Sequence, residues 1–259
     1  MKTRKVGVGD PELAVVGSIH GDEPCGKKAI EKFLDSEYEV QKPIKFLIAN
    51  EKALEQNKRF LEADLNRSFP GDPESEKHEE RLAAKIVDEL EGLKILDIHS
   101  TRSQPTPYAA FGGMDDRTLD VVSSAGMKKA CYFPEGSGSL NSVVSGSVVE
   151  VGPQGTETAE KQAYEVLINF LAAEGIIDAD YEKTDPLIVE KYETVSGGDW
   201  EFKATNFEKV EPGEVFAEHG TTQLTSTEGF YPVLMSTNGY ELILGHKARK
   251  LGKASELQD

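Results

Sequence analysis

Residues 15–24 constrain the fold more than any other stretch, because they contain a predicted strand and a turn that leads into a predicted helix. The apolar, β-branched part ends in Gly-Ser, and residues 26–34 have the apolar spacing of a helix. His20 and Glu23 lie three residues apart in the turn, so both side chains can point at one cation. They are candidate metal ligands. Alternatively, Glu23 favours the positive end of the helix dipole and His20 is an ordinary polar residue at a strand end.

The composition indicates a globular protein that does not cross a membrane. The 259 residues suffice for one large domain or for a domain with a smaller appendage. No apolar run approaches the roughly 18 residues of a membrane span, and the net charge of −17 disfavours nucleic acid and anionic membranes as partners. The acidic surface could reflect a high-salt cytoplasm, although the many lysines weaken that interpretation.

Two further features of the sequence bear on the compartment. The basic N-terminus has no apolar segment after it, so it does not resemble a secretory signal and we expect a cytoplasmic protein. Cys25 and Cys131 lie far apart and outside any C-x-x-C spacing. This argues against a disulfide framework and against a thiolate zinc site, and predicts two small buried residues.

Predicted strands and helices alternate along the first two thirds of the chain and indicate an α/β fold. We expect strands at residues 43–50, 93–101, 130–133 and 147–153, and helices at residues 51–58, 76–90, 114–128 and 154–175. From residue 186 onward, short β-like runs separated by Gly, Pro and Asn predict a small all-β domain. We therefore expect two domains, at residues 1–178 and 179–259, with residues 247–259 as a frayed tail.

Polar side chains follow or interrupt three of the predicted strands. His20 and Glu23 follow the first, His99 ends another, and Glu150 lies among valines in a third. The carboxyl ends of parallel strands meet at one crevice, so these side chains can converge. Two histidines and a carboxylate form a common catalytic zinc set, and a further carboxylate can act as general base. Alternatively, Glu150 belongs to a structural ion pair.

Four motifs occur in order along the chain: SIHGDE at 18–23, DLNRSFPG at 64–71, LDIHST at 96–101 and VEVGPQ at 149–154. In these motifs the sequence resembles the succinylglutamate desuccinylase/aspartoacylase family, amidohydrolase relatives of the zinc carboxypeptidases. The resemblance covers about residues 12–175, with a looser match through the β-rich end. It implies a mixed, mostly parallel sheet flanked by helices, with a small C-terminal all-β domain.

The resemblance also implies roles for individual residues. His20, Glu23 and His99 would hold one zinc ion per chain. Glu150 would take a proton from the zinc-bound water and later deliver it to the leaving amine.

Four more residues match positions that contact the substrate in the family. Arg59 would polarise the scissile carbonyl, Asn66 and Arg67 would bind a substrate carboxylate, and Tyr240 would line the pocket. Arg59 could instead be a solvated charge at a helix end, and Asn66 a turn former.

One departure from the family concerns the substrate. Aspartoacylases carry a further arginine shortly before the strand with the base, whereas residues 136–147 contain no basic residue. N-acetylaspartate is therefore in doubt as the substrate. His78, His219 and His246 have no motif around them, and we place them outside the site.

The implied function is zinc-dependent hydrolysis of the amide bond of a small N-acyl amino acid or related metabolite. The alternatives are a zinc metallocarboxypeptidase acting on short peptides and a non-catalytic metal- or ligand-binding relative. The β-rich domain argues against the first, because in this family it narrows the cleft. Loss of Glu150 or of a ligand would have favoured the second. The expected partner is a small-molecule substrate, and the chain could also form a homodimer.

Overall fold

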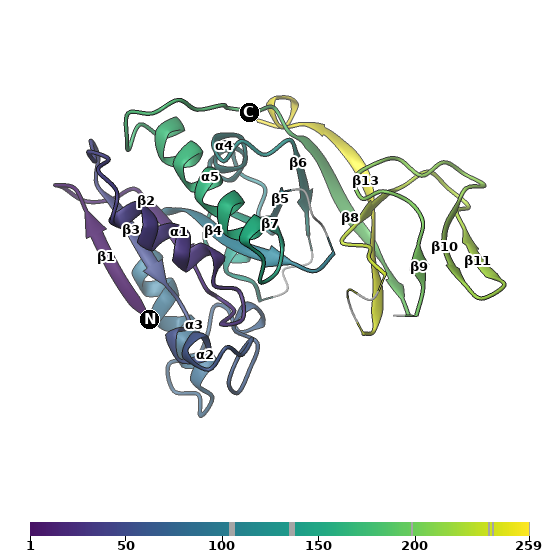
Figure 1. Ribbon diagram of the computed structural model, residues 1–259, viewed down its shortest axis with the longest axis horizontal. Coiled ribbons are helices and arrows are strands. Elements are labelled where there is room, and N and C mark those ends of the chain that lie inside the picture. The colour runs from purple at the N-terminus through teal and green to yellow at the C-terminus, as the bar shows by residue number, and fades with distance from the viewer. Residues whose placement is uncertain (104–106, 135–137, 198, 238, 240, 259) are drawn as a thin grey trace.

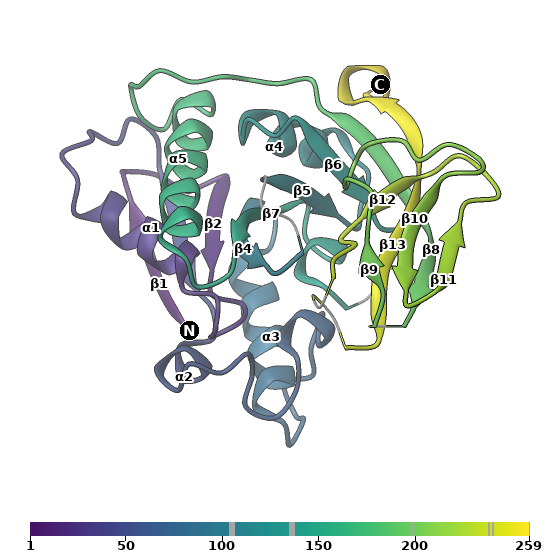
Figure 2. The same cartoon turned by 45° about the vertical axis from the view of Figure 1, so that its right-hand side comes forward.

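The computed structural model describes residues 1–103, 107–134, 138–197, 199–237, 239 and 241–258. Figures 1 and 2 show a body of helices around a sheet, from which β-rich segments of the C-terminal part project to one side. The strands are β1 (Lys2–Val6), β2 (Leu13–Gly17), β3 (Ile44–Ile48), β4 (Lys94–Thr101), β5 (Tyr108–Phe111), β6 (Lys129–Tyr132), β7 (Gly146–Pro153), β8 (Leu187–Ser196), β9 (Glu201–Phe202), β10 (Val215–His219), β11 (Thr222–Thr225), β12 (Tyr231–Val233) and β13 (Ile243–Lys253).

The helices are α1 (Cys25–Leu34), α2 (Glu51–Glu55), α3 (His78–Leu90), α4 (Asp116–Ser124) and α5 (Glu157–Ala173). Three short 3-10 turns complete the described elements, at Leu65–Arg67, Leu140–Ser142 and Ala254–Glu256. None of the helices in the described part of the chain is long and apolar enough to span a bilayer.

Within the described residues, ten strands form one sheet in the order β1-β3-β2-β4-β7-β5-β6-β8-β13-β12, and β11-β10-β9 form a second. The pairs among β2, β3, β4 and β7 are parallel, as are β5 with β6 and β6 with β8. The predicted α/β fold with a mostly parallel sheet and a small antiparallel C-terminal sheet is therefore confirmed.

The helices cover both faces of the large sheet. Apolar residues of α1, α4 and α5 pack with β2, β4 and β7 in the larger core, whereas α3 packs through Leu82, Ala83 and Ile86 on the opposite face. In Figure 2, α1, α4 and α5 lie over the upper part of the sheet and α3 below it. Parallel strands covered on both faces must be apolar on both sides, which explains the continuous apolar runs of β2 and β3.

At the chain ends, one of our predictions is wrong and one strand was missed. Residues 247–253 belong to β13, which pairs with β8 and β12, and Ala254 is buried, so the expected frayed tail is an ordered part of the large sheet. At the other end, β1 pairs antiparallel with β3 although it was not expected as a strand. Its residues are mostly exposed, so it lacks the apolar alternation that identifies a strand.

Large parts of the C-terminal β-rich segment continue the main sheet. Parallel pairing of β6 with β8 joins β8, β13 and β12 to the α/β body, while β9, β10 and β11 form the separate small sheet. The domain boundary near residue 178 stays a prediction.

Candidate metal centre and substrate cavity

A sharp turn after β2 brings His20 and Glu23 into the protein interior. Ser18 has a positive φ of 58°, a conformation that costs a non-glycine residue about 1–2 kcal/mol. The start of α1 packs directly on the end of β2, because a Cβ on Gly26 would lie 2.9 Å from the Cα of Gly17. His20 and Glu23 are 3% and 4% exposed. The close packing of α1 on β2 therefore holds the turn between them, with His20 and Glu23, in the interior.

Glu23 lies between two histidines, His20 in the turn after β2 and His99 on β4. Its Oε1 is 2.9 Å from His20 Nδ1, and its Oε2 is 3.3 Å from His99 Nδ1. One ligand atom from each of the three residues lies within 4.8 Å of the others, and the two imidazole rings are 5.1 Å apart, edge to face. The predicted ligand set is therefore brought together.

A second carboxylate lies behind each histidine. Asp64 Oδ1 is 3.2 Å from His20 Nε2, and Asp97 Oδ2 is 2.9 Å from His99 Nε2. A neutral imidazole donates a hydrogen bond through only one nitrogen. If each Nε2–H is donated to its aspartate, each Nδ1 lone pair faces Glu23, an arrangement that a cation between the three groups would satisfy. The residues therefore fit a divalent metal ion.

Glu23 also accepts hydrogen bonds from two groups other than the histidines. Ser100 N–H donates to its Oε2 at 3.0 Å, and Arg59 Nη1 donates to its Oε1 at 3.3 Å. Burial by itself would raise the pKa of Glu23, but its interactions with His20 and His99 outweigh burial and lower the pKa below its ordinary value. Glu23 is therefore an anion, the form that binds a metal.

Glu150 lies on β7, directly beside β4 in the sheet. It is the register partner of His99, and its Oε2 is buried without a hydrogen-bond partner in the described structure. Burial, only partly offset by His99, raises the pKa of Glu150 to about 7. A carboxylate with a free oxygen and a pKa near neutrality suits a group that accepts and returns a proton.

The polar loop after α2 is positioned by a buried carboxylate of α3. Glu79 is 0% exposed and accepts hydrogen bonds from the backbone N–H groups of Leu61, Glu62 and Ala63, at 2.8–3.1 Å, and from Asn50 Nδ2. Burial raises the pKa of Glu79, but these hydrogen bonds outweigh it and lower the pKa. Glu79 thus fixes the loop immediately before Asp64.

Three predicted substrate residues come from this loop. Arg59 Nε donates to Asp64 Oδ2 at 3.1 Å, so Arg59 lies beside the metal cluster, with its side chain 42% exposed. Asn66 Oδ1 accepts a hydrogen bond from Leu140 N–H at 3.3 Å. Arg67 Nη1 donates to the Asn66 carbonyl at 2.6 Å. The loop therefore presents two guanidinium groups and an amide beside the cluster.

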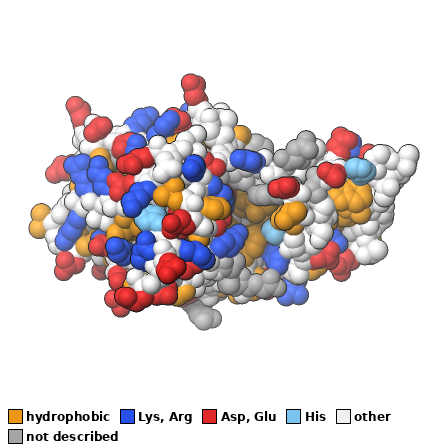
Figure 3. All heavy atoms as spheres, turned by 90° about the horizontal axis from the view of Figure 1, so that it is seen from below, with side chains coloured by type: hydrophobic (Ala, Val, Ile, Leu, Met, Phe, Trp, Pro, Cys, Tyr) orange, Lys and Arg blue, Asp and Glu red, His pale blue; other side chains and the backbone are white. Residues whose placement is uncertain are grey.

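These residues line one cavity of about 510 Å³ together with the metal cluster, Glu150 and part of the C-terminal segment. Its walls include His20, Glu23, Arg59, Asn66, Arg67, His99, Arg102, Glu150, Gln154, Leu234, Glu241, Ile243 and His246. The volume is within the range of about 300–1,000 Å³ typical of small-molecule sites. Figure 3 shows the molecule from below, with basic and acidic side chains mixed over the surface and histidine visible among them.

Two predictions need comment at this cavity. Tyr240 lies outside the described residues, so its position is untested. His246, which we placed outside the site, lines the cavity. Asp64, Asp97 and Glu79 were not predicted; Asp64 and Asp97 fall inside the matching motifs, so their place next to the ligands could have been suspected.

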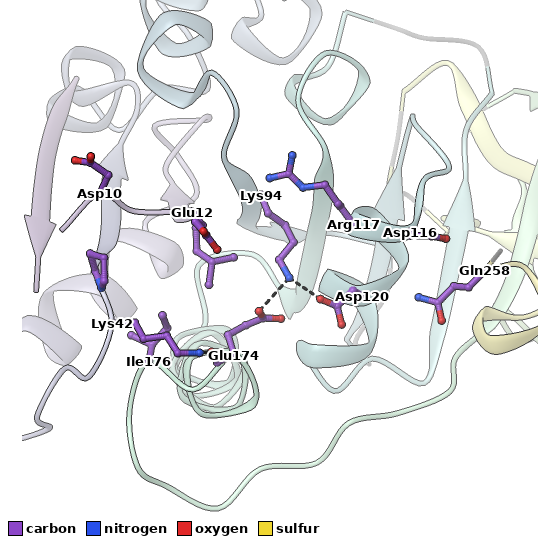
Figure 4. A pocket seen from close by; sticks show the side chains of 12 residues that line it. Asp10, Glu12, Lys42, Lys94, Asp116, Arg117, Asp120, Glu174, Ile176 and Gln258 are labelled. Atoms are coloured by element: carbon purple, nitrogen blue, oxygen red, sulfur yellow. Dashed lines mark hydrogen bonds and ion pairs between the residues drawn. The ribbon is translucent and has the colours of Figure 1, made fainter. Parts of the chain in front are cut away.

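A larger cavity of about 740 Å³ lies elsewhere, at the amino ends of β2 and β4, where Leu13 and Lys94 line it. Figure 4 shows Lys94 directed at Asp120 and Glu174. Lys94 Nζ bonds Asp120 at 2.5 Å and Glu174 at 3.0 Å. None of the described metal-cluster residues lines this cavity, so we assign the candidate site to the smaller one.

Comparison with known proteins identifies the family of this chain. The model of the succinylglutamate desuccinylase/aspartoacylase catalytic domain matches residues 9–172. A probable aspartoacylase from Nostoc sp. is 28% identical over 197 residues, covering 68% of this chain and 61% of the relative. One from Trichodesmium erythraeum is 27% identical over 199 residues, covering 68% and 62%. The chain thus spans about three fifths of the length of these curated relatives.

Solved structures share the fold. A succinylglutamate desuccinylase/aspartoacylase from Rhodobacter sphaeroides superimposes with a TM-score of 0.76 at 19% identity, covering 96% of this chain and 89% of that one. Murine aminoacylase 3 gives a TM-score of 0.71 at 20% identity, with 94% and 97% covered. With the family model matching well over half of its residues, the chain belongs to the succinylglutamate desuccinylase/aspartoacylase family.

Proposed function

We propose that this protein is a zinc-dependent hydrolase that cleaves the amide bond of a small N-acyl amino acid or a related metabolite. The observation that supports this best is the composition of one cavity. It holds a three-residue metal cluster, a carboxylate with a pKa near 7, and an Asn-Arg pair suited to a substrate carboxylate. Each of these groups has a distinct task in amide hydrolysis.

Zinc is the metal we propose, at one ion per chain. Two imidazole nitrogens and a carboxylate oxygen form a ligand set that zinc commonly adopts at catalytic sites, with a fourth position left open. Held by His20, Glu23 and His99, it would polarise a carbonyl and lower the pKa of water. Asp64 and Asp97 would keep both histidines in the tautomer that binds metal.

Glu150 is the proposed proton carrier. Its carboxylate accepts a proton from the attacking water, and the resulting carboxylic acid donates that proton to the departing nitrogen. A raised pKa serves both steps, because the group is then neither too weak a base nor too weak an acid at neutral pH. The alternative role in a structural ion pair receives no support, since Oε2 has no hydrogen-bond partner in the described structure.

The loop residues would bind and orient the substrate. Asn66 and Arg67 bind a carboxylate of the amino-acid half, for which a guanidinium offers two parallel hydrogen bonds. Arg59 polarises the scissile carbonyl from its position beside Glu23. Tyr240 completes the pocket in this proposal.

A metallocarboxypeptidase would need room for a peptide, which is longer than the small substrate that we propose. Leu234, Glu241, Ile243 and His246 of the C-terminal segment form part of the cavity wall, which leaves less room for a long peptide. We therefore keep residues 1–178 as the catalytic part and residues 179–259 as the part that narrows its entrance. The sequence retains His20, Glu23, His99 and Glu150, and this supports an enzyme over a non-catalytic relative.

A hydrolysis screen tests the proposal. Zinc-loaded protein is incubated with N-acyl amino acids that vary in acyl group and amino acid, and in parallel with short peptides, and released amines are quantified. Turnover of N-acyl amino acids that stops on chelation and returns with zinc supports the proposal. Release of C-terminal residues from peptides, without turnover of any N-acyl amino acid, would identify a carboxypeptidase instead.

A further inference from the structure

Gln154 directly follows β7, and its side chain reaches the ends of the two strands next to β7 that lead to the metal ligands. Gln154 Nε2 donates to the backbone carbonyl of Asp22 at 3.1 Å, and Arg102 Nε donates to Gln154 Oε1 at 3.1 Å. Asp22 lies in the turn after β2, and Arg102 directly follows β4. The strands β2, β4 and β7 are consecutive in the sheet, as Figures 1 and 2 show. One side chain thus links three strand ends of the candidate site.

The two partners of Gln154 fix the orientation of its amide group. A guanidinium has only donors, so it needs the amide oxygen, and a backbone carbonyl has only an acceptor, so it needs the amide nitrogen. A glutamate at this position could accept from Arg102 but could not donate to Asp22. A methionine would lack both amide groups. The two contacts therefore require the amide of glutamine.

The carbonyl that accepts from Gln154 belongs to the turn with two of the three candidate ligands. Asp22 directly precedes Glu23 in this turn and lines the substrate cavity. Gly21 N–H donates to the Arg59 carbonyl at 3.2 Å, which ties the turn to the polar loop. The hydrogen bond from Gln154 ties the same turn to the end of β7. The backbone beside Glu23 is therefore held by contacts with two separate segments.

The backbone of Gln154 is itself fixed by the sheet. Gln154 N–H donates to the Thr101 carbonyl at 3.1 Å, and Thr101 is the register partner of Pro153. The pairing of β7 with β4 thus continues one residue past the end of β7. Strands hold a site more precisely than loops do. Gln154 therefore connects the turn after β2 to the rigid part of the site.

We propose that Gln154 is a positioning residue for the metal centre: its amide, oriented by Arg102, holds the turn of His20 and Glu23 in the arrangement that binds zinc. This inference rests on the proposed function for the choice of zinc. Neither Gln154 nor Arg102 hydrogen-bonds a ligand side chain in the described part of the chain. Their effect on the metal passes through the backbone of Asp22.

The test measures zinc affinity in variants that remove one contact at a time. Gln154→Met removes both hydrogen bonds at a similar side-chain length. Gln154→Glu keeps the acceptor for Arg102 and removes the donor to Asp22. Arg102→Met keeps the donor and removes the group that orients it, and a double variant combines Gln154→Met with Arg102→Met. Gln223→Met on β11 is the matched control, because it removes an exposed glutamine that hydrogen-bonds Glu218 and does not line the cavity.

The zinc dissociation constant is obtained by competition with a chelating dye. All titrations contain high salt, which screens the charge added by Gln154→Glu. Gln154→Met should raise the dissociation constant about 2- to 10-fold, the scale of one neutral hydrogen bond. Gln154→Glu should raise it similarly, because the donor to Asp22 is lost although Arg102 keeps its acceptor. Gln223→Met should match wild type.

The variants of Arg102 show whether this residue acts through Gln154. Arg102→Met should raise the zinc dissociation constant less than Gln154→Met does. The double variant should bind zinc as Gln154→Met does, because Arg102 has no effect once the amide is gone. A purely structural role for the two residues would instead give losses that add. Additive losses, or a normal zinc affinity in both Gln154 variants, would overturn the inference.

Urea unfolding of the metal-free proteins separates positioning from a general loss of structure. Metal-free Gln154→Met should be fully folded without urea and unfold in one transition, as Gln223→Met does. A metal-free Gln154→Met that is already partly unfolded without urea would attribute its weaker zinc binding to the fold, and this would contradict a positioning role.

The zinc titrations need no turnover, so this inference and the proposed function can fail separately. A wild type that binds zinc but hydrolyses no N-acyl amino acid would contradict the proposed hydrolysis and not the role of Gln154. An active wild type whose Gln154 variants bind zinc equally well would contradict the role of Gln154 and not the hydrolysis.

Discussion

Glu150 on β7 and His99 on β4 are register partners in neighbouring parallel strands. The sheet itself therefore sets the separation between a metal ligand and the proposed proton carrier. Sites built on strands hold their geometry more precisely than sites built on loops. By contrast, the residues proposed to contact the substrate come from a loop that Glu79 holds by hydrogen bonds. They are Arg59, Asn66 and Arg67.

Metal binding should depend on His99 and, to a smaller degree, on Asp97. We expect wild type to hold about one zinc per chain, and His99→Ala to lose most of it because one of three ligands is gone. Asp97→Asn should weaken zinc affinity about 10- to 100-fold, since a carboxylate behind a ligating histidine fixes its ring and tautomer. Zinc is quantified by atomic emission after dialysis, with His219→Ala on β10 as the control. Full zinc content in His99→Ala would refute the ligand assignment.

Substrate binding should depend on Glu79, which lies outside the cavity. Glu79→Ala leaves three backbone N–H groups and the Asn50 amide without their acceptor. We expect a loss of about 3 kcal/mol in the free energy of unfolding, and a higher KM because Asn66 and Arg67 are no longer held in place. Urea denaturation and steady-state kinetics measure the two effects. Glu91→Ala, at the exposed end of α3, should change neither. An unchanged KM in Glu79→Ala would mean that the loop is held by other contacts.

The parts of the fold that sequence could predict are those whose side chains carry a local pattern. The runs of β2, β3, β4 and β7 are apolar because both faces of the strands are covered, and each ligand follows or interrupts such a run. The second half of β13 was missed because it is largely polar and its place depends on long-range pairing with β8, from Ile243 with Ser196 to Lys253 with Leu187.

His246 shows the same limit for the site. Nothing near this residue in the sequence marks it as functional, and it reaches the cavity through long-range strand pairing. Pairing register is decided by tertiary packing rather than by local propensity. Residues in motifs could thus be assigned from sequence, whereas those supplied by the β-rich segment required the structure.

The free energy of unfolding should decrease as the pH is lowered, and His246 should contribute to this decrease. Its pKa is lowered from 6.5 to about 4 in the folded chain, so between these values the unfolded chain binds a proton that the folded chain does not. Stability from this group is therefore present above about pH 6.5 and is lost as the pH falls toward about 4. The free energy of unfolding is measured by urea denaturation at pH 7, 5 and 4, with chelator in every sample. Between pH 7 and pH 4 it should decrease less for His246→Gln than for wild type. His219→Gln is the control. Parallel declines in all three proteins would show that His246 does not contribute.

Glu150→Gln tests the central claim most directly. The substitution keeps the size of the side chain and removes its ability to accept a proton. We measure kcat on an N-acyl amino acid substrate found in the screen, together with the zinc content of the same sample. The predicted result is an unchanged zinc content with kcat reduced by about 10²- to 10⁴-fold, the usual share of general acid–base catalysis, and little change in KM. A variant as active as wild type would make Glu150 structural, and a variant that has lost its zinc would make it a ligand; either result would contradict the account.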